Sequence, residues 1–553
     1  MKSNIVRFLL LLTIVLGVNV LSEMFFFRLD LTEEKRYSVS EATKKLLSNL
    51  EKPVNVKVYL TGDNLPAKFK KLEKEVFDML TEFKIYGGKN INFRFIDLTK
   101  EIKSDKEREE KYLSLYQKGI PPTNIHNKDK GNLVQTMVVP GAVLSVENKE
   151  IGVLLLKGNK FSTAEDQLVQ SANNVEFNLA SAIKQLTLKE RKKIGFFVNQ
   201  STLAAAKQYD LLSALRKSYD LYPVDLKLSS TLQGLDAIFV LKPDVVFTDN
   251  DKYKIDQFVV NGGKALFFLD GTQVDSVARE GSMIQPLNVE LSDLFFKYGL
   301  RLNQNLIKDA QMCAQIPMNV GTFGSNANIQ LVPWNYSPIV NNFGKSTIVK
   351  NIDAILLKYT SSIDTVRADG ITKTPLLMTS PYTQTLNAPA LLAYNVASKE
   401  AMTSKYNGGV KTIAYLLEGK FESLFKNRIL PNDTNFKSFK TKGTASKVIV
   451  CADGDLPVNE VDYKQKMPYP MGFDKYASKV FANKDFVMNA VDYLLDNNGV
   501  ISSKNKELKY RPLDKEIVQN EQNYWYVFNL VLPIILLISI GMIFTFFRAR
   551  QYT

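Results

Sequence analysis

The chain has 553 residues, of which 45% are apolar and 23% are charged, as is typical of folded globular protein. Its 71 lysines and arginines exceed its 57 acidic residues, and the formal net charge is +14. The basic residues are mixed with acidic ones, as in Lys103–Lys111, and form no continuous stripe. We therefore expect a solvated surface and no nucleic-acid partner.

Two segments are long and apolar enough to cross a membrane as helices, residues 8–27 and 525–547. A membrane-spanning helix needs ~20 such residues. Roughly 500 residues of soluble character lie between them, which is too many for one hydrophobic core and indicates two or three domains. This layout predicts a membrane-anchored protein and excludes a channel or carrier that acts by itself.

The charges next to these segments predict their orientation. Lys2 and Arg7 precede the first segment, Arg548 and Arg550 follow the second, and neither tail contains an acidic residue. Short basic tails stay in the cytoplasm, so we expect both termini there and residues 54–514 outside. No small-x-small cleavage site follows the first segment, which indicates an uncleaved anchor.

Residues 36–188 are predicted to form the first domain. Ser38 and Glu41 have capping-box spacing, so a helix is expected to begin there. Hydrophobic periodicity then predicts an alternation of strands and helices. The expected elements are strand 54–60, helix 66–86, strand 91–97, helix 103–118, a hairpin of 142–146 with 151–155, and helix 164–186.

This order, β-α-β-α-β-β-α, resembles the thioredoxin-like fold. Pro140 stands just before the third strand, where that fold places its cis-proline. The redox chemistry of the fold requires a Cys-x-x-Cys pair at the start of the first helix. Thr61–Pro66 occupies that place without a cysteine, so we expect a redox-inactive module for recognition or scaffolding.

Residues 189–505 are predicted to form a second, α/β domain. The apolar runs Ile194–Val198, Ala237–Leu241 and Ala265–Leu269 are typical of strands buried on both faces. Helical patterns at about 209–218 and 249–261 separate them. Strands alternating with helices at this spacing indicate a doubly wound, Rossmann-like parallel sheet.

A long insertion is expected within this domain, at about 272–446, with strands at 375–379 and 413–417. Val448–Cys451 is then predicted to return to the large sheet, and Asp485–Asp496 to pack on it as an amphipathic helix. Residues 506–523 form a juxtamembrane linker to the second apolar segment.

Catalytic motifs are incomplete in this sequence. Phe343–Thr347 contains Gly-Lys-Ser-Thr, but a phosphate-binding loop needs a glycine five residues before its second glycine, and Ile339 stands there. The single histidine, His126, falls in a polar loop. Neither Cys313 nor Cys451 sits in a nucleophile elbow of the kind that class I glutamine amidotransferases use. We expect two buried thiols, with a disulfide between them as the alternative.

Two acidic pairs, Asp249/Asp251 and Asp453/Asp455, could hold a cation. Neither pair has the further oxygen ligands of a calcium loop, and turns and helix caps use the same residues. We therefore expect no catalytic residue, no cofactor and no metal site.

The second apolar segment contains polar and small residues that a plain anchor does not need: Asn529, Pro533, Ser539 and Gly541. An amide within lipid seeks a partner, and small residues let another helix approach closely. We expect these four residues to dock the segment on another membrane protein. The alternative is that Asn529 lies in the interface and is hydrated.

Six stretches of the soluble part are specific as a set through their order and spacing, although none of them is catalytic. They are residues 36–40, 52–60, 332–336, 361–364, 374–380 and 417–423. Together they resemble the GldG-type auxiliary proteins of gliding-motility-associated ABC transporters.

The resemblance implies a Bacteroidetes protein of the inner (cytoplasmic) membrane with a large periplasmic domain. It implies a separate ATPase subunit and a multi-span permease as partners, and a link to gliding machinery in the envelope. The family's doubly wound domain also resembles one in eukaryotic intraflagellar-transport proteins, where it serves assembly.

Three functions remain open from the sequence. The first is a non-catalytic, membrane-anchored auxiliary subunit of an ABC transporter complex. The second is an extracytoplasmic module that captures a solute, such as a glycan or a peptide, between the two domains. The third is an envelope enzyme that acts through carboxylates, for which Asp453 and Asp455 would carry turnover.

Overall fold

The computed structural model describes residues 13, 38–63, 65–129, 132–156, 164–274, 281–324, 326–392, 405–428, 439–496, 499–505 and 515–552. The first predicted membrane segment, residues 8–27, lies outside the described residues apart from Thr13. The chain divides into two compact units, Met1–Glu507 and Leu508–Thr553.

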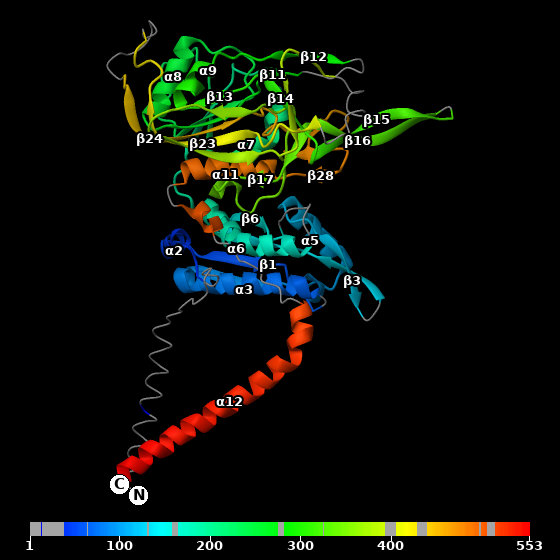
Figure 1. The fold of residues 1–553 in the computed structure, drawn as a ribbon, viewed down its shortest axis with the longest axis vertical. Helices are drawn as coiled ribbons and strands as arrows, with labels where there is room; N and C mark the ends of the chain where they lie inside the picture. Colours follow the sequence, from blue (N-terminus) through cyan, green and yellow to red (C-terminus); the bar gives the residue numbers. More distant parts are fainter. Residues whose placement is uncertain are drawn as a thin grey trace. The chain divides into compact units, whose positions relative to one another are not determined.

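A four-stranded sheet organises the N-terminal part of the first unit (Figure 1). Its order is β2-β1-β5-β6, in which β1 (Val54–Val58) runs parallel to β2 (Ile91–Phe95) and antiparallel to β5 (Gly141–Val146), and β6 (Lys149–Leu154) is antiparallel to β5. The apolar residues of β1 alternate with polar ones and are buried, which gives this sheet its packed face.

Helices cover both faces of this small sheet. Helices α2 (Glu41–Ser48), α3 (Ala67–Gly87) and α6 (Ala164–Thr187) share one hydrophobic core with the apolar residues of β1. A second, smaller core is formed by different side chains. It includes Leu98, at the start of α4 (Leu98–Glu101), and Leu115 of α5 (Asp105–Gln117). The predicted strands, helices and hairpin of this part are confirmed, with ends shifted by a few residues.

Three details of the first part differ from expectation. Helix α2 is capped by Ser40, whose side chain accepts from the Thr43 N–H, so the cap lies two residues after Ser38. The described cis peptide bond precedes Pro389, and Pro140 is not cis. A hairpin of β3 (Thr123–Asp129) and β4 (Asn132–Val138) was not predicted, because polar and apolar residues follow one another there without a clear period.

The larger sheet has eight strands in the order β17-β20-β23-β24-β10-β9-β7-β8. Five of them run parallel: β8 (Asp220–Val224), β7 (Lys193–Phe197), β9 (Ala237–Leu241), β10 (Lys264–Phe268) and β24 (Lys442–Cys451). The return of residues 448–451 to this sheet, beside β10, is therefore confirmed.

The predicted parallel sheet is present but makes up only part of the larger sheet. Strands β23 (Thr412–Glu422), β20 (Ile371–Met378) and β17 (Asn342–Phe343) extend it with antiparallel pairs. These strands come from the predicted insertion, so the insertion completes the sheet instead of lying outside it.

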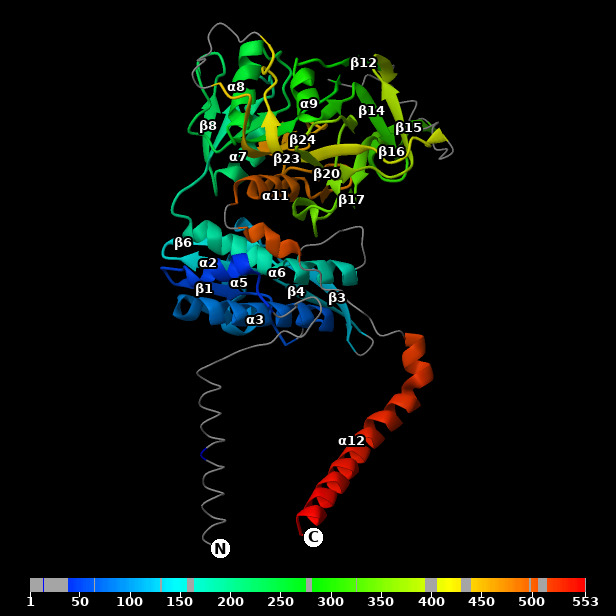
Figure 2. The ribbon, with the colours of Figure 1, turned by 60° about the vertical axis from the view of Figure 1, so that its left-hand side comes forward.

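Helices lie on both sides of the larger sheet (Figures 1 and 2). Alternate residues of its central strands pack into two cores. One core includes side chains from α7 (Tyr209–Leu215) and α11 (Asn483–Leu495). The other includes side chains from α8 (Asp249–Val260) and α9 (Ser292–Tyr298). The strands are buried on both faces, as their continuous apolar runs predict.

The rest of the insertion forms small sheets at one end of the large one. They are β11 (Thr272–Gln273), β12 (Ser282–Pro286) and β22 (Ala390–Leu392); β13 (Leu300–Leu302) with β19 (Ile363–Thr365); β14 (Asn305–Asp309) with β21 (Thr383–Asn387); and β15 (Cys313–Phe323), β16 (Asn326–Val340) and β18 (Ile355–Leu356). The β15–β16 hairpin extends away from the sheets in both views (Figures 1 and 2).

Short elements complete the first unit. Two small hairpins follow β24, β25 (Val461–Asp462) with β26 (Met467–Pro468) and β27 (Phe473–Asp474) with β28 (Lys479–Val480). The described 3-10 helices are η1 (Gly88–Asn90), η2 (Ala205–Gln208), η3 (Thr347–Val349) and η6 (Val500–Asn505).

The second unit contains α12 (Lys515–Tyr552), with Pro533 inside it. Within the described part of the chain, this helix alone is long and apolar enough to cross a membrane, over Asn520–Arg548. The predicted segment 525–547 lies inside that stretch.

Candidate functional site

The register of the parallel strands brings polar residues together at one edge of the large sheet. Leu241 of β9 pairs with Phe268 of β10, and Phe268 pairs with Cys451 of β24. The chain therefore leaves all three strands at the same level, just before Lys242, Asp270 and Asp453. In doubly wound sheets, the carboxyl ends of the strands are where ligands bind.

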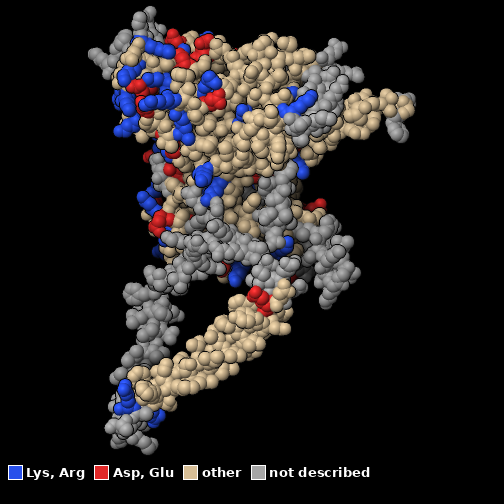
Figure 3. Space-filling model, viewed as in Figure 1, with Lys and Arg blue, Asp and Glu red and all other residues tan. Residues whose placement is uncertain are grey.

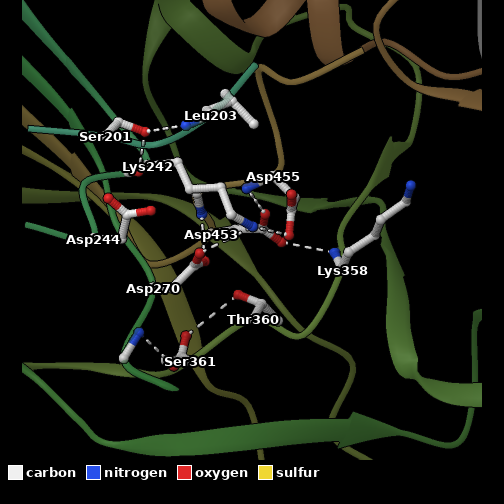
Figure 4. Close-up of polar contacts among 12 residues, drawn as sticks. Ser201, Leu203, Lys242, Asp244, Asp270, Lys358, Thr360, Ser361, Asp453 and Asp455 are labelled. Carbon is white, nitrogen blue, oxygen red and sulfur yellow. Dashed lines mark hydrogen bonds and ion pairs between the residues drawn. The ribbon is translucent and has the colours of Figure 1, made fainter. Parts of the chain in front are cut away.

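Lys242 lies among three carboxyl groups, and we call Lys242, Asp270, Asp453 and Asp455 the lysine–aspartate cluster (Figure 4). Its Nζ is 3.2 Å from Asp270 Oδ2 and 2.6 Å from Asp455 Oδ2. Burial alone would lower the pKa of Lys242, but the facing Asp270 and Asp455 raise it. The ammonium group of Lys242 is therefore held charged. It occupies the position that a bound cation would need in order to balance these carboxylates.

Asp453 is fully buried and accepts two backbone hydrogen bonds, from Asp455 N at 2.9 Å and from Lys358 N at 2.8 Å. Burial, together with Asp455 and Asp270, nevertheless raises its pKa well above the usual range. Burial likewise raises the pKa of Asp270. Burial and the neighbouring carboxyl groups therefore favour the neutral form of Asp453, beside a Lys242 ammonium that its partners keep charged.

The backbone around the cluster leaves little room. The N–H of Gly454 donates to Asp270 Oδ1 at 2.7 Å, and a Cβ at Gly454 would come within 2.7 Å of Asp270 Oδ2. On the neighbouring chain segment, the Thr360 hydroxyl donates to Ala452 O at 3.0 Å. These contacts fix the loop after β24 and, with it, both aspartates of that loop.

A cavity of about 430 Å³ opens beside the cluster. Lys242 and Asp455 form part of its wall, together with a second ion pair between Lys358 and Glu460. Other parts of the wall are aromatic or aliphatic, including Trp334. The cavity thus presents paired charges next to apolar surface, a combination that can hold a polar solute or a partner's loop in a fixed orientation.

The arrangement does not supply an activated nucleophile. Burial raises the pKa of Cys451 well above the usual thiol range, and burial with nearby Asp309 raises that of Cys313 to about 11. Both cysteines are free thiols. The only histidine of the chain, His126, lies in β3. No group of three metal-ligating side chains occurs among the residues that the structure describes.

The comparison with known families identifies the class of this protein. Residues 191–490 match a family described as an ABC-type uncharacterized transport system, the ABC transporter auxiliary family. The match covers more than half of the chain and includes the whole lysine–aspartate cluster. The chain belongs to this family.

Membership of the ABC transporter auxiliary family implies a permease and an ATPase as partners and supports a non-catalytic auxiliary role. The N-terminal residues 33–145 match a domain of unknown function, DUF7088. The chain is also 23% identical over 440 residues to an uncharacterized protein of Borreliella burgdorferi, covering 78% of this chain and 80% of that protein. A solved structure, the mmIFT52 N-terminal domain, aligns with a TM-score of 0.31 and 11% identity over 54% of this chain and 96% of that one.

The two acidic pairs of this auxiliary protein differ in their surroundings. Asp251 forms a capping box with Thr248 at the start of α8, and Asp249 pairs with Lys252 at 2.9 Å. Asp251 thus serves as a helix cap and Asp249 as an ion-pair partner, as residues at the start of a helix commonly do. Asp453 and Asp455, by contrast, lie in the cluster. They are the residues to which the enzyme hypothesis assigns turnover.

The Gly-Lys-Ser-Thr stretch does not form a phosphate loop. It connects the edge strand β17 to η3, a 3-10 helix of three residues that Ser346 caps. A Cβ at Gly344 would lie 1.8 Å from Pro375 O of β20. This glycine is therefore required by the close passage of a neighbouring strand.

The four residues predicted to dock on a membrane partner all lie in α12. Asn529, Pro533, Ser539 and Gly541 are exposed in this unit. The Ser539 hydroxyl donates to Ile535 O at 2.8 Å, and a Cβ at Gly541 would meet no atom within 4 Å. Docking by these residues stays a prediction.

Sequence reasoning did not single out Lys242, Asp270, Lys358 or Glu460. A usable signal exists for the first two, because each follows a continuous apolar run that reads as a buried strand. The carboxyl ends of parallel strands share one edge, so such residues become neighbours. Lys358 and Glu460 lie in irregular segments, for which the sequence offers no comparable signal.

Proposed function

We propose that this chain is a non-catalytic, membrane-anchored auxiliary subunit of an ABC transporter complex linked to gliding motility in Bacteroidetes. The observation that carries the proposal is the family match over residues 191–490, followed by an apolar helix of membrane-spanning length. The stretches resembling GldG-type proteins add the link to gliding. The auxiliary protein would work beside a separate permease and a separate ATPase.

In this proposal, the soluble part recognises a partner or substrate. The cavity beside the lysine–aspartate cluster supports recognition, because two ion pairs, Lys242–Asp455 and Lys358–Glu460, stand in its wall. A ligand can hydrogen-bond to paired charges without leaving either charge buried and alone. We assign no catalytic residue, cofactor or metal to it.

We also propose two soluble domains, at 36–188 and 189–505, with the insertion at about 272–446. The hydrophobic cores support this division, except that Val500 packs in the core of the first domain. The strand order β2-β1-β5-β6, with one parallel and two antiparallel pairs, supports a thioredoxin-like first domain. No cysteine occurs in Thr61–Pro66, so this domain would be redox-inactive.

We propose that residues 8–27 and 525–547 both span the inner membrane, with both termini cytoplasmic and the soluble domains in the periplasm. The basic, acid-free tails at both ends support this orientation. Residues 506–523 would link the second domain to the second span.

The experiment exchanges residues 525–553 for an unrelated single-span anchor and measures co-purification with the permease and ATPase, together with gliding. We expect both to be lost, because Asn529, Pro533, Ser539 and Gly541 would dock on the permease. A control exchange of residues 506–523 for a polar linker of equal length is expected to retain the complex. Undiminished co-purification after the anchor exchange would refute docking by this helix.

A second candidate is an extracytoplasmic solute-binding module, which a larger cavity of about 590 Å³ favours. Phe177 and Asn178 of α6 line one side of it, and Tyr219 and Asp492 of the second domain line the other. Lys184 Nζ and Asp496 Oδ1 join the two sides at 2.6 Å. The space suits a glycan or peptide segment held between the two domains.

The solute-binding candidate is tested by thermal unfolding of the full chain with pools of glycans or peptides. A binding solute raises the midpoint by mass action, and Phe177→Ala is expected to abolish that shift. Phe77→Ala, an exposed phenylalanine of α3, serves as the control. If no pool shifts the midpoint of the unsubstituted chain, this candidate is rejected.

A further inference from the structure

The hairpin of β15 and β16 has an unusual composition. Residues 310–344 contain no aspartate, glutamate, lysine, arginine or histidine, although 23% of the chain is charged. The described part of the hairpin that extends from the body carries neither blue nor red atoms in Figure 3. Interfaces are depleted of charge at their centres in the same way.

One face of this hairpin is exposed. Opposite residues in an antiparallel pair lie on the same face, and the register pairs Gln315 with Pro333, Pro317 with Leu331, and Asn319 with Ile329. All six side chains are exposed, including Ile329 at 66% and Leu331 at 48%. We call these six residues the arm face.

The opposite face is more covered. Ile316, Met318 and Val332 are half-buried there, and Ala314 and Trp334 are buried. A two-stranded ribbon with one open apolar face is marginally stable by itself in water. The arm face would therefore gain stability from a covering surface.

The geometry favours packing through the face instead of through the strand edges. Pro317 and Pro333 have no N–H to donate to an added strand, so edge pairing would be interrupted on both strands. The aliphatic and proline side chains of the arm face, by contrast, can pack against another sheet about 10 Å away.

We propose that the arm face is a self-association surface that packs against the arm face of a second copy of this chain. A charged partner or a lipid headgroup would lose its hydration against this face without receiving a counter-charge. A second copy brings an identical, uncharged face. Two copies of a chain with a net charge of +14 repel each other as whole molecules. Because the arm extends away from the body (Figure 1), contact through the arm keeps the charged bodies apart.

The expected contact is two-fold and weak. In such a contact, each residue of the face meets the same set on the other copy. Six residues cover much less than the roughly 800 Å² per partner of a standard interface. Confinement to one membrane raises the effective concentration and compensates for small area; this step rests on the proposed anchoring.

The test is disulfide crosslinking of the full-length chain in membranes, in a Cys313→Ser background. Oxidation of the Leu331→Cys variant is expected to give a covalent dimer. The matched control is Gln330→Cys, because Gln330 is the next residue, is equally exposed and lies on the opposite face. We expect at least fivefold less dimer from the control.

Adding Ile329→Lys to the Leu331→Cys variant is expected to reduce the dimer at least fivefold, since it places like charges face to face. Ile329 is exposed, so the thermal midpoint should be unchanged, which separates lost contact from lost folding. Equal crosslinking at both cysteine positions, absence of any dimer, or a crosslink to a different polypeptide would each overturn the proposal. The first two outcomes leave the auxiliary-subunit function untouched.

Discussion

Lys242 carries the charge balance at the carboxyl edge of the large sheet. It faces Asp270 and Asp455 and lies near the buried Asp453. Removing one partner of a buried ion pair leaves the other charges without compensation, which costs more than the pair itself contributes. Substitutions of Lys242 and of Asp453 therefore test this balance directly.

We expect Lys242→Met to lower the free energy of unfolding of the full chain by about 3 kcal/mol. Methionine keeps the length of the side chain but leaves Asp270 and Asp455 facing each other. The measurement is denaturant unfolding in detergent. Lys207→Met changes a lysine of the same cavity wall and is expected to change stability by no more than about 0.5 kcal/mol. Equal effects of the two variants would contradict the role of Lys242.

The raised pKa of Asp453 predicts a pH dependence of stability. A carboxyl group whose pKa is raised on folding binds more protons in the folded state, so its contribution weakens as pH rises from about 4, the ordinary value, toward the raised one. Asp453→Asn cannot titrate. The destabilisation it causes, relative to the unsubstituted chain, is therefore expected to be smaller at pH 8 than at pH 5.

The control for this dependence is Asp462→Asn. Backbone N–H groups of Gln465 and Lys464 lower the pKa of Asp462, so its contribution is lost only as pH falls below about 4. Its effect should be constant between pH 5 and pH 8. A pH-independent difference for Asp453→Asn would show that Asp453 is ionised throughout this range.

At the scale of elements, the edge strand β17 depends on a close approach to β20. Gly344 follows β17 and faces Pro375 O, and Gly344 N–H donates to Leu376 O at 3.0 Å. The same glycine belongs to the stretch that resembles a phosphate loop in composition. If the stretch has only a structural role, Gly344 should matter for stability and Lys345 should not. If it binds nucleotide, Lys345 should be essential.

We expect Gly344→Ala to lower the free energy of unfolding by about 1–3 kcal/mol, because the added methyl group forces β17 away from β20. Lys345→Ala should change stability by no more than about 0.5 kcal/mol. Denaturant unfolding measures both. A phosphate loop would instead make Lys345 essential for ATP binding. Loss of ATP binding in Lys345→Ala would therefore refute the conclusion that this stretch has only a structural role.

At the scale of the whole molecule, the orientation of the chain in the membrane is open to direct labelling. We expect a cysteine introduced at Asn148 to react with an impermeant maleimide from the periplasmic side. Cysteines introduced at Lys2 and Gln551 should react only after the membrane is permeabilised, because the basic tails hold both ends in the cytoplasm. Labelling of either tail but not of Asn148 in intact cells would reverse the proposed topology.

Local patterns in the sequence determined much of this protein. Runs of buried residues such as Ala237–Leu241 give the parallel strands, and the apolar segment 525–547 gives a helix of spanning length. Both signals act over short distances, through side-chain period and length. The sequence also showed Asp453 and Asp455 as an acidic pair that follows a predicted core strand.

The tertiary structure decided what these residues do. The register of three strands brings together the residues of the lysine–aspartate cluster, which follow those strands, and the insertion adds antiparallel strands to the sheet. The hairpin β3–β4 depends on strand pairing, and the cap of α2 depends on the hydrogen bond to Ser40. Composition specifies neither. The cluster and the added strands arise from contacts between residues far apart in the chain. The cap arises because Ser38 and Ser40 are both able to cap the helix. Local sequence patterns decide neither.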